Sequence, residues 1–171
     1  VADHIDGPSV VIHPGVPEPQ VERLQPAEQV ILVAQRLEAE KRTELAIRAF
    51  AASGLAGQGW QLHVAGDGSQ RTMLEALAAR LVPGQVRFLG HRADVPQRMA
   101  RAAMVLASCK VEGLGLSVVE AMALGVPVVA AAAGGHLETV GGVADAALFA
   151  PDDEHEAGGL LRELAADPQR R

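Results

Sequence analysis

Short apolar runs alternate with longer amphipathic stretches along most of the chain. The runs are rich in Val, Ile, Leu and Ala and contain little polar alternation, which is typical of strands buried on both faces of a parallel sheet. We therefore expect strands at residues 10–12, 30–34, 60–65, 86–89, 103–107, 126–131 and 146–149.

Helical periodicity fills the stretches between these runs. The clearest apolar stripe joins Met73, Leu74, Leu77, Ala78 and Leu81, and further helices are expected at residues 45–50, 94–101, 116–124 and 154–166. Repeated alternation of strand and helix implies right-handed crossovers. The sequence thus predicts one α/β domain, a Rossmann-like, doubly wound parallel sheet of about six strands with helices on both faces.

The two ends of the chain differ from this pattern. Four prolines between residues 14 and 26 exclude regular structure there. We therefore expect residues 1–27 to form a first strand and an interdomain connector, and residues 28–171 to form the folded domain. The tail after residue 165 ends without a further packing signal. We therefore expect one domain cut from a longer protein.

The overall charge narrows the classes of ligand. The 171 residues include 15 Lys and Arg against 21 Asp and Glu, a net charge of −6, and 49% of the residues are apolar. The apolar content suffices for one buried core. The excess of acids argues against a nucleic-acid surface or a membrane-surface binder. An anionic ligand must therefore be met by a few placed cations.

The sequence favours a reducing compartment. Cys109 is the single cysteine, so no internal disulfide can form. No apolar run reaches the roughly 18 residues that a transmembrane helix needs, and the chain starts without a signal-peptide pattern. We expect a cytoplasmic protein with no membrane contact by this domain. Peripheral attachment of a full-length protein to the inner membrane is left open.

Candidate chemistry lies in the loops after the strands, because open α/β sheets bind ligands beyond the carboxyl ends of their strands. Gly113 and Gly115 let the backbone come close to a ligand, and a helix that begins at Leu116 presents free N–H groups suited to phosphate.

Glu112 and Glu120 flank the predicted anion site. Carboxylates accept hydrogen bonds from hydroxyls and repel phosphates, so the combination suits a molecule that carries both phosphates and sugars. The alternative is that both acids are solvated groups at the cap and surface of a helix, and that the glycines only close a tight turn.

Arg36 and Lys41 follow the apolar run at 30–34 and precede a helix. A guanidinium and an ammonium in this position can clamp a diphosphate, the first as a fork and the second as a point charge. The alternative is that both are exposed charges that pair with Glu38 and Glu40.

Two further loops offer backbone contacts. Gly66 lies in a Gly-Asp-Gly turn without the third glycine of a dinucleotide fingerprint. We expect a tight turn there, with Ser69 as a helix cap and Gly66 close to the ligand. Only 2% of the residues are aromatic, so stacking platforms are scarce. We expect backbone groups of the loop at His91 and Arg92 to hold a base, with an exposed loop histidine as the alternative. The loop at 133–138 either lines the same crevice or caps a short helix.

In order and spacing, these motifs resemble the C-terminal, donor-binding domain of retaining GT-B glycosyltransferases of family 4. The resemblance covers essentially the whole chain. Arg42, Leu114, Leu137 and Pro14 depart from the family's usual glycine, aromatic residue, proline and asparagine, and none of these departures removes a charged group. The matching segments are residues 11–16, 36–41, 65–68, 88–90, 112–122 and 134–138.

The resemblance implies a role for each candidate residue. Arg36 and Lys41 would neutralise the pyrophosphate that becomes the leaving group. Glu120 would accept hydrogen bonds from the ribose hydroxyls, and Glu112 would orient hydroxyls of the transferred sugar. Backbone N–H groups from Leu114 to Ser117 would hold sugar oxygens and the phosphate. The donor would be a GDP-, UDP- or ADP-hexose, transferred without a metal or other cofactor, and the acceptor would be bound by the missing N-terminal domain.

We expect this domain alone to bind nucleotide and to transfer nothing. Two other interpretations stay open. One is a GT-B epimerase or phosphorylase relative, although no lysine context for pyridoxal phosphate is visible. The other is a non-catalytic nucleotide- or partner-binding Rossmann-like domain.

Overall fold

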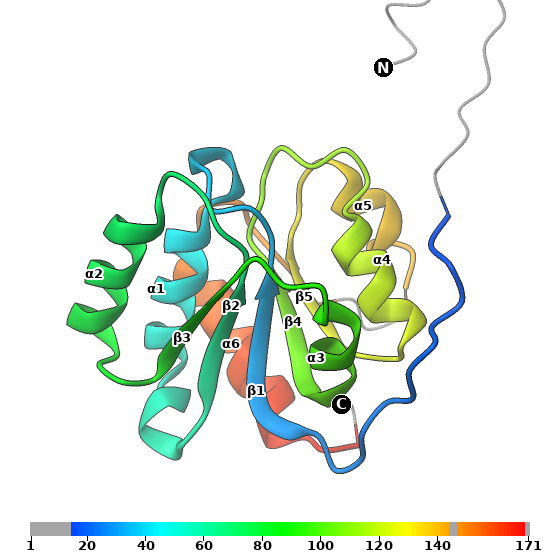
Figure 1. Cartoon of the computed structure of the whole chain (residues 1–171), viewed down its shortest axis with the longest axis horizontal. Helices are drawn as coiled ribbons and strands as arrows, with labels where there is room; N and C mark the ends of the chain where they lie inside the picture. The colour runs from blue at the N-terminus through cyan, green and yellow to red at the C-terminus, as the bar shows by residue number, and fades with distance from the viewer. Residues whose placement is uncertain (1–14, 144–146, 170–171) are drawn as a thin grey trace, which may run out of the picture.

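A six-stranded parallel sheet forms the centre of the molecule (Figure 1). The computed structural model describes residues 15–143 and 147–169, so the strand expected at 10–12 lies outside the described residues. Every apolar run from residue 30 onward forms a strand, which confirms the predicted fold class. The strands are β1 (Glu28–Ala34), β2 (Gln61–Ala65), β3 (Val86–Gly90), β4 (Ala102–Ala107), β5 (Val128–Ala131) and β6 (Ala147–Phe149).

Helices cover both faces of this sheet, and each face has its own core. Successive side chains of β1 alternate between the cores, as the twofold period of a strand requires. The helices are α1 (Thr43–Ser53), α2 (Arg71–Leu81), α3 (Val95–Arg101), α4 (Leu116–Ala123), α5 (Gly135–Thr139) and α6 (Glu154–Ala166), with short 3-10 turns η2 (Ala39–Lys41) and η3 (Leu55–Gln58). Ile31 packs in one core with α1, α2 and α6, and Leu32 packs in the other with α3 and α4.

Two differences between the predicted and the observed elements have a clear physical reason. The stripe on α2 is narrower than expected, because Leu74, Leu77 and Ala78 are buried while Met73 and Leu81 are exposed. The reason is that α2 packs on α1 and β3 at the edge of the sheet, where only part of its surface meets a partner. The strand expected from residue 126 begins at residue 128, since Pro127 has no N–H to donate to a neighbouring strand.

The strand order is β3-β2-β1-β4-β5-β6. Strands β2 and β3 are added on one side of β1, and β4, β5 and β6 are added on its other side. The chain winds outward from β1 to β3 and then returns to the centre to wind outward from β4 to β6. The loops after β1 and β4 therefore leave the same edge in opposite directions and open a crevice between them. Residues 35–42 and 108–115 form those two loops.

The described part of the predicted connector, residues 15–27, contains no helix or strand, as its prolines predict. It runs along α3 and α4, and the Leu24 N–H donates to the carbonyl oxygen of Ala100 at 2.8 Å. Its role between two domains stays a prediction. Among the helices of the described residues, none has the length and apolar character needed to cross a bilayer.

Candidate functional site

Two adjoining cavities open at the carboxyl ends of β1 and β4. The Lys41 cavity has a volume of about 420 Å³ and the Glu120 cavity about 470 Å³. They share a wall formed by Ala34, Gln35, Arg36 and Ser117. The Lys41 cavity is also lined by Lys41, Glu112, Leu114, Gly115, Leu116 and His136. The Glu120 cavity is also lined by Gly66, Asp67, His91, Arg92, Val95 and Glu120. The structure thus brings every predicted site residue except Gly113 to one of the two cavities.

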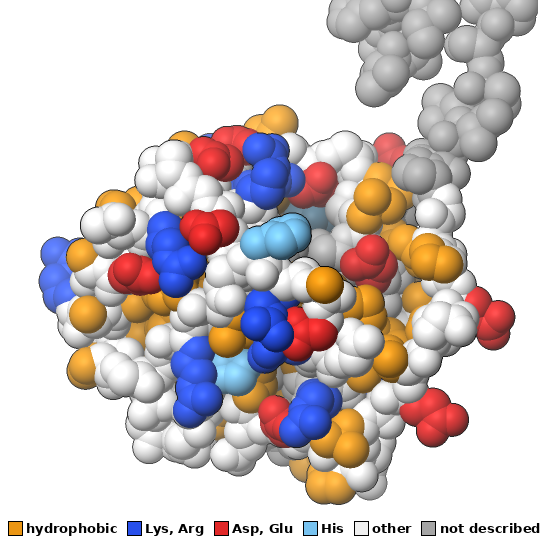
Figure 2. Space-filling model, viewed as in Figure 1, with side chains coloured by type: hydrophobic (Ala, Val, Ile, Leu, Met, Phe, Trp, Pro, Cys, Tyr) orange, Lys and Arg blue, Asp and Glu red, His pale blue; other side chains and the backbone are white. Residues whose placement is uncertain are grey.

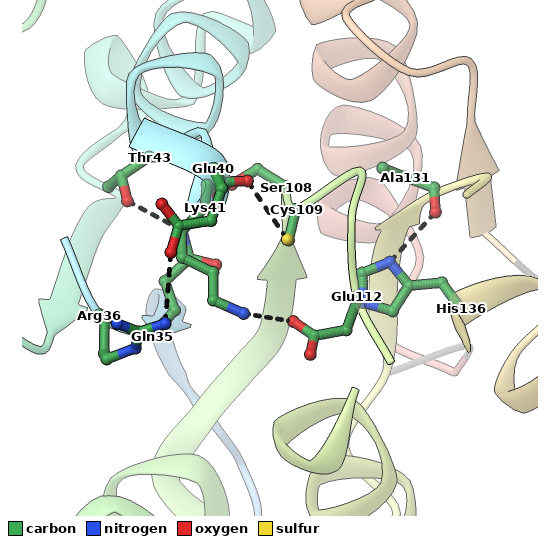
Figure 3. A network of polar contacts seen from close by, with 10 residues as sticks. All are labelled: Gln35, Arg36, Glu40, Lys41, Thr43, Ser108, Cys109, Glu112, Ala131 and His136. Atoms are coloured by element: carbon green, nitrogen blue, oxygen red, sulfur yellow. Dashed lines mark hydrogen bonds and ion pairs between the residues drawn. The ribbon is translucent and has the colours of Figure 1, made fainter. Parts of the chain in front are cut away.

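An ion pair between Lys41 and Glu112 crosses the Lys41 cavity. The Lys41 Nζ and Glu112 Oε2 atoms are 2.7 Å apart, and Figure 3 shows the two side chains pointing toward each other from separate loops. Burial alone would raise the pKa of Glu112, but the hydrogen bond and charge of Lys41, with a smaller effect of His136, lower the pKa below its usual value. Glu112 is therefore ionised at neutral pH and faces a cation.

The turn that carries Lys41 is fastened to both central strands. The side-chain amide of Gln35 donates to the carbonyl oxygen of Lys41 at 2.9 Å and to Thr43 Oγ1 at 2.8 Å. The Ser108 hydroxyl donates to the same Lys41 carbonyl oxygen at 3.0 Å. Gln35 and Ser108 were not among the predicted site residues. A polar residue directly after a buried strand was the signal that could have identified them.

His136 is buried, and its ring lies beside the Glu112 side chain on the side away from Lys41 (Figure 3). Its Nδ1 atom is 3.2 Å from the carbonyl oxygen of Ala131, which can only accept, so Nδ1 carries the proton. Burial is the main cause that lowers the pKa of His136, so the ring is neutral at pH 7 and Nε2 is an acceptor. The sequence left open whether this loop lines the crevice or caps a short helix, and it did not single out His136. In the structure His136 lines the Lys41 cavity and also lies in the short helix α5.

The first turn of α4 contributes Ser117 to the wall that the two cavities share. Gly115 precedes the helix with a φ of 81°, and a Cβ there would lie 2.8 Å from His136 Cδ2, so glycine satisfies both the backbone and the packing. The first N–H groups of a helix have no partner within it, and Leu116 and Ser117 provide them here. Gly113 lines neither cavity and packs against Gly135 instead. A Cβ added to Gly135 would lie 2.3 Å from the carbonyl oxygen of Gly113.

The Glu120 cavity contains a carboxylate in a different setting. Burial raises the pKa of Glu120 above its usual value. Arg92 lines the same cavity but is engaged by Asp94, with the Nε–Oδ1 distance at 2.7 Å and the Nη2–Oδ2 distance at 2.9 Å. The structure thus gathers the acid expected at a ribose and the loop expected at a base around one space.

Gly66 and Ser69 hold two loops together. A Cβ on Gly66 would lie 1.8 Å from the carbonyl oxygen of Gln35, so this glycine lets the loops after β1 and β2 touch. The prediction that Ser69 caps a helix was wrong, because α2 begins only after Gln70. The Ser69 hydroxyl instead donates to Glu38 Oε2 at 2.6 Å, since a carboxylate from the neighbouring loop is a stronger acceptor.

The two predicted cations differ in their partners. Arg36 forms an exposed pair with Glu40 at 3.2 Å, which matches the alternative stated for it, whereas Lys41 pairs with Glu112 rather than with Glu38 or Glu40. Over the face in Figure 2, acidic and basic side chains are interspersed instead of forming one basic patch. In the described part of the chain, no group of three or more His, Cys, Asp or Glu side chains could hold a metal ion.

Comparison with known families and proteins gives a consistent result. The model of the family Glycosyl transferases group 1 matches residues 17–171. The 2-deoxystreptamine glucosyltransferase of Streptomyces kanamyceticus is 34% identical over 81% of this chain and 37% of that enzyme. A GDP-mannose-dependent alpha-(1-6)-phosphatidylinositol dimannoside mannosyltransferase of Mycobacterium tuberculosis is 31% identical over 83% of this chain and 37% of that enzyme.

Solved structures show the same fold. HepE of Anabaena, in a crystal structure with UDP-glucose, is 33% identical and superimposes with a TM-score of 0.74 over 82% of this chain and 40% of HepE. WaaG, a glycosyltransferase involved in lipopolysaccharide biosynthesis, is 26% identical with a TM-score of 0.75 over 86% of this chain and 40% of WaaG. The chain therefore spans well under half the length of these relatives.

Proposed function

The chain belongs to the glycosyl transferases group 1 family, and from this premise we propose that it holds the nucleotide-sugar donor of a hexosyltransferase. The donor is a nucleoside-diphosphate hexose, and the reaction transfers the hexose to an acceptor hydroxyl with retention of configuration and without a metal ion. Retention rests on the resemblance of segment 112–122 to that of retaining enzymes. The acceptor is bound by a further part of the protein, so this chain alone binds nucleotide and transfers nothing.

The observation that carries the proposal is the pair of adjoining cavities with different chemistry. A sugar nucleotide contains a base and ribose, then two phosphates, then a sugar. The Glu120 cavity offers a hydroxyl acceptor and loop backbone, the shared wall offers the Ser117 N–H and Arg36, and the Lys41 cavity offers a cation and a second carboxylate. The order of groups along the crevice matches the order of groups in the ligand.

The phosphates lie at the shared wall in this proposal. The α4 N-terminus carries a partial positive charge, and Lys41 adds a full charge when its ammonium turns from Glu112 to the distal phosphate. When the bond between the sugar and that phosphate breaks, negative charge grows on the leaving diphosphate. Lys41, Arg36 and the helix N–H groups stabilise this charge, which lowers the barrier to transfer.

The sugar lies in the Lys41 cavity and the nucleoside in the Glu120 cavity. Glu112 and the acceptor Nε2 of His136 line the sugar subsite and can accept hydrogen bonds from its hydroxyls. Glu120 accepts from the ribose hydroxyls, and the backbone around Gly66 and His91 faces the base.

Calorimetric titration of the chain with UDP, GDP and ADP tests this proposal. We expect one of the three to bind, and the Lys41→Ala and Glu120→Ala variants to bind it about tenfold or more weakly, because each loses a hydrogen bond to a charged group. Arg87→Ala and Glu163→Ala serve as matched controls, since both side chains are exposed and line neither cavity. Unchanged affinity in both site variants would favour a non-catalytic binding domain.

A further inference from the structure

Two non-glycine residues in the described part of the chain have a positive φ, and both lie at the edge that carries the site. Arg42 has a φ of 53° and Asp152 a φ of 71°. This left-handed region crowds the Cβ of an L-residue and is disfavoured outside glycine, asparagine and aspartate. Arg42 is thus held in a conformation that needs support from its surroundings.

These two residues are bound to each other. Arg42 Nη1 forms an ion pair with Asp152 Oδ1, and the other carboxylate oxygen of Asp152 is 3.0 Å from Lys110 Nζ. Arg42 belongs to the loop after β1, Lys110 to the loop after β4, and Asp152 to the loop after β6. One carboxylate therefore ties together three loops at the carboxyl edge of the sheet.

The tied residues flank both partners of the ion pair in the Lys41 cavity. Arg42 directly follows Lys41, and Lys110 precedes Glu112 by two positions. We propose that Asp152 is a positioning residue that holds the Lys41 and Glu112 loops at a fixed separation, from which the Lys41 ammonium contacts Glu112 in the free chain and can turn to the distal phosphate of a bound donor. The phosphate part of this inference rests on the proposed function. Asp152 itself lines neither cavity.

The physical reason for such a tie is the distance in sequence between Lys41 and Glu112, which are 71 positions apart. Their loops have no covalent connection near the site, so the geometry of the pair depends on contacts between the loops. Gln35 and Ser108 fasten the Lys41 backbone at the base of the cavity. Asp152 adds a tie on the outer rim, where its side chain is 47% exposed and salt therefore weakens the contact.

A ligand-free measurement tests the tie directly. NMR titration of the Glu112 carboxyl reports its contact with Lys41, because that contact lowers the Glu112 pKa. In the Asp152→Asn variant the left-handed backbone is retained, since asparagine tolerates it, and only the charge is removed. We expect the Glu112 pKa to rise toward its usual value. Glu28→Gln is the matched control, as it breaks the exposed pair with Arg101 at the opposite edge of the sheet and leaves the Glu112 pKa unchanged.

Binding of nucleotides provides the second measurement. We expect Asp152→Asn to weaken a nucleoside diphosphate about three- to fivefold and to leave the corresponding monophosphate unchanged, since only the distal phosphate reaches Lys41. Arg42→Gly suits the backbone but removes the tie together with the ion pair between Arg42 and Glu44, and it should have the same selective effect. A merely structural role would weaken both nucleotides equally.

The outcomes separate the tie from the proposed function. If neither Asp152→Asn nor Arg42→Gly moves the Glu112 pKa, or if both weaken mono- and diphosphate alike, the inference is wrong. If the unaltered chain binds no nucleotide while Asp152→Asn still raises the Glu112 pKa, the tie stands and the proposed function fails.

Discussion

The two cavities at the carboxyl ends of β1 and β4 each contain a glutamate, and the pKa values of these two glutamates are shifted in opposite directions. Glu112 faces Lys41 at 2.7 Å and its pKa is lowered in spite of burial, whereas the pKa of Glu120 is raised by burial. The loops around Glu112 are joined by ion pairs and side-chain hydrogen bonds. Around Glu120, the cation Arg92 is already bidentate with Asp94.

This difference indicates how each cavity responds to a ligand. In the proposed complex, a phosphate at the shared wall has to compete with Glu112 for the Lys41 ammonium, so its affinity is the difference between two charge-assisted interactions. A hydroxyl that enters the Glu120 cavity donates to a carboxylate that burial has deprived of water, and the contact restores lost solvation. In the proposed complex, Lys41 would exchange one anionic partner for another, whereas Glu120 would gain a hydrogen-bond donor.

The largest expected effect comes from breaking the Lys41 cavity at its backbone. In Gly135→Ala the new Cβ would lie 2.3 Å from the carbonyl oxygen of Gly113, so the loops after β4 and β5 must separate. We expect a loss of about 1–3 kcal/mol in the free energy of unfolding, measured by urea denaturation. Gly142→Ala is the control, because a Cβ there has no atom within 4 Å. Equal stability of the two variants would contradict the close packing of these loops.

The second expected effect is an opposite change in nucleotide affinity when each of the two carboxylates is removed. Glu112→Gln removes the competitor for Lys41, and we expect it to tighten binding of a nucleoside diphosphate about three- to tenfold. Glu120→Gln removes a ribose acceptor, and we expect it to weaken the same ligand by a similar factor. Calorimetric titration of both variants measures the two changes. Shifts of the same sign would show that the cavities do not differ as described.

The smallest effect is a difference in pH dependence. Because the folded-state pKa of Glu120 is raised, its carboxylate becomes protonated on acidification before a solvated glutamate does, and nucleotide affinity should begin to fall at that higher pH. The ionised form is disfavoured in the folded state, so Glu120 contributes less to stability as pH rises through that pKa. Titrations repeated across pH with the unaltered chain and Glu120→Gln isolate this contribution, since protonation of the phosphates affects both proteins equally. Parallel profiles would contradict it.

The sequence predicted the central sheet well because a strand that is buried on both faces is a continuous run of apolar residues, which is visible in the local sequence. In β4, for example, all six residues are buried and apolar, and such a run has few other interpretations. The α2 stripe was overestimated because sequence periodicity does not reveal that a helix lies at the edge of a sheet. Ser69 was misassigned since its acceptor, Glu38, comes from a different loop.

The chemistry of the site was predictable in kind but not in pairing. Because Arg36, Lys41 and Glu112 each follow a strand, the sequence predicted that they lie at the carboxyl edge of the sheet, and the structure places them around the cavities. That Lys41 contacts Glu112 follows from the adjacency of β1 and β4, which no local pattern encodes. His136 gave no periodic signal either, and its neutral state depends on burial and on the carbonyl of Ala131. The roles assigned to all these residues stay predictions.

The adjacency of β1 and β4 also bears on how the chain folds. Gln35 and Ser108, which meet above the paired strands, are 73 positions apart, so the intervening segment must close a long loop before the crevice exists. Contacts of such high sequence separation form slowly and are gained late. A nucleotide bound as proposed needs both strands and therefore has no site until they have paired. Its stabilisation of the native state should emerge as slower unfolding, with the refolding rate unchanged.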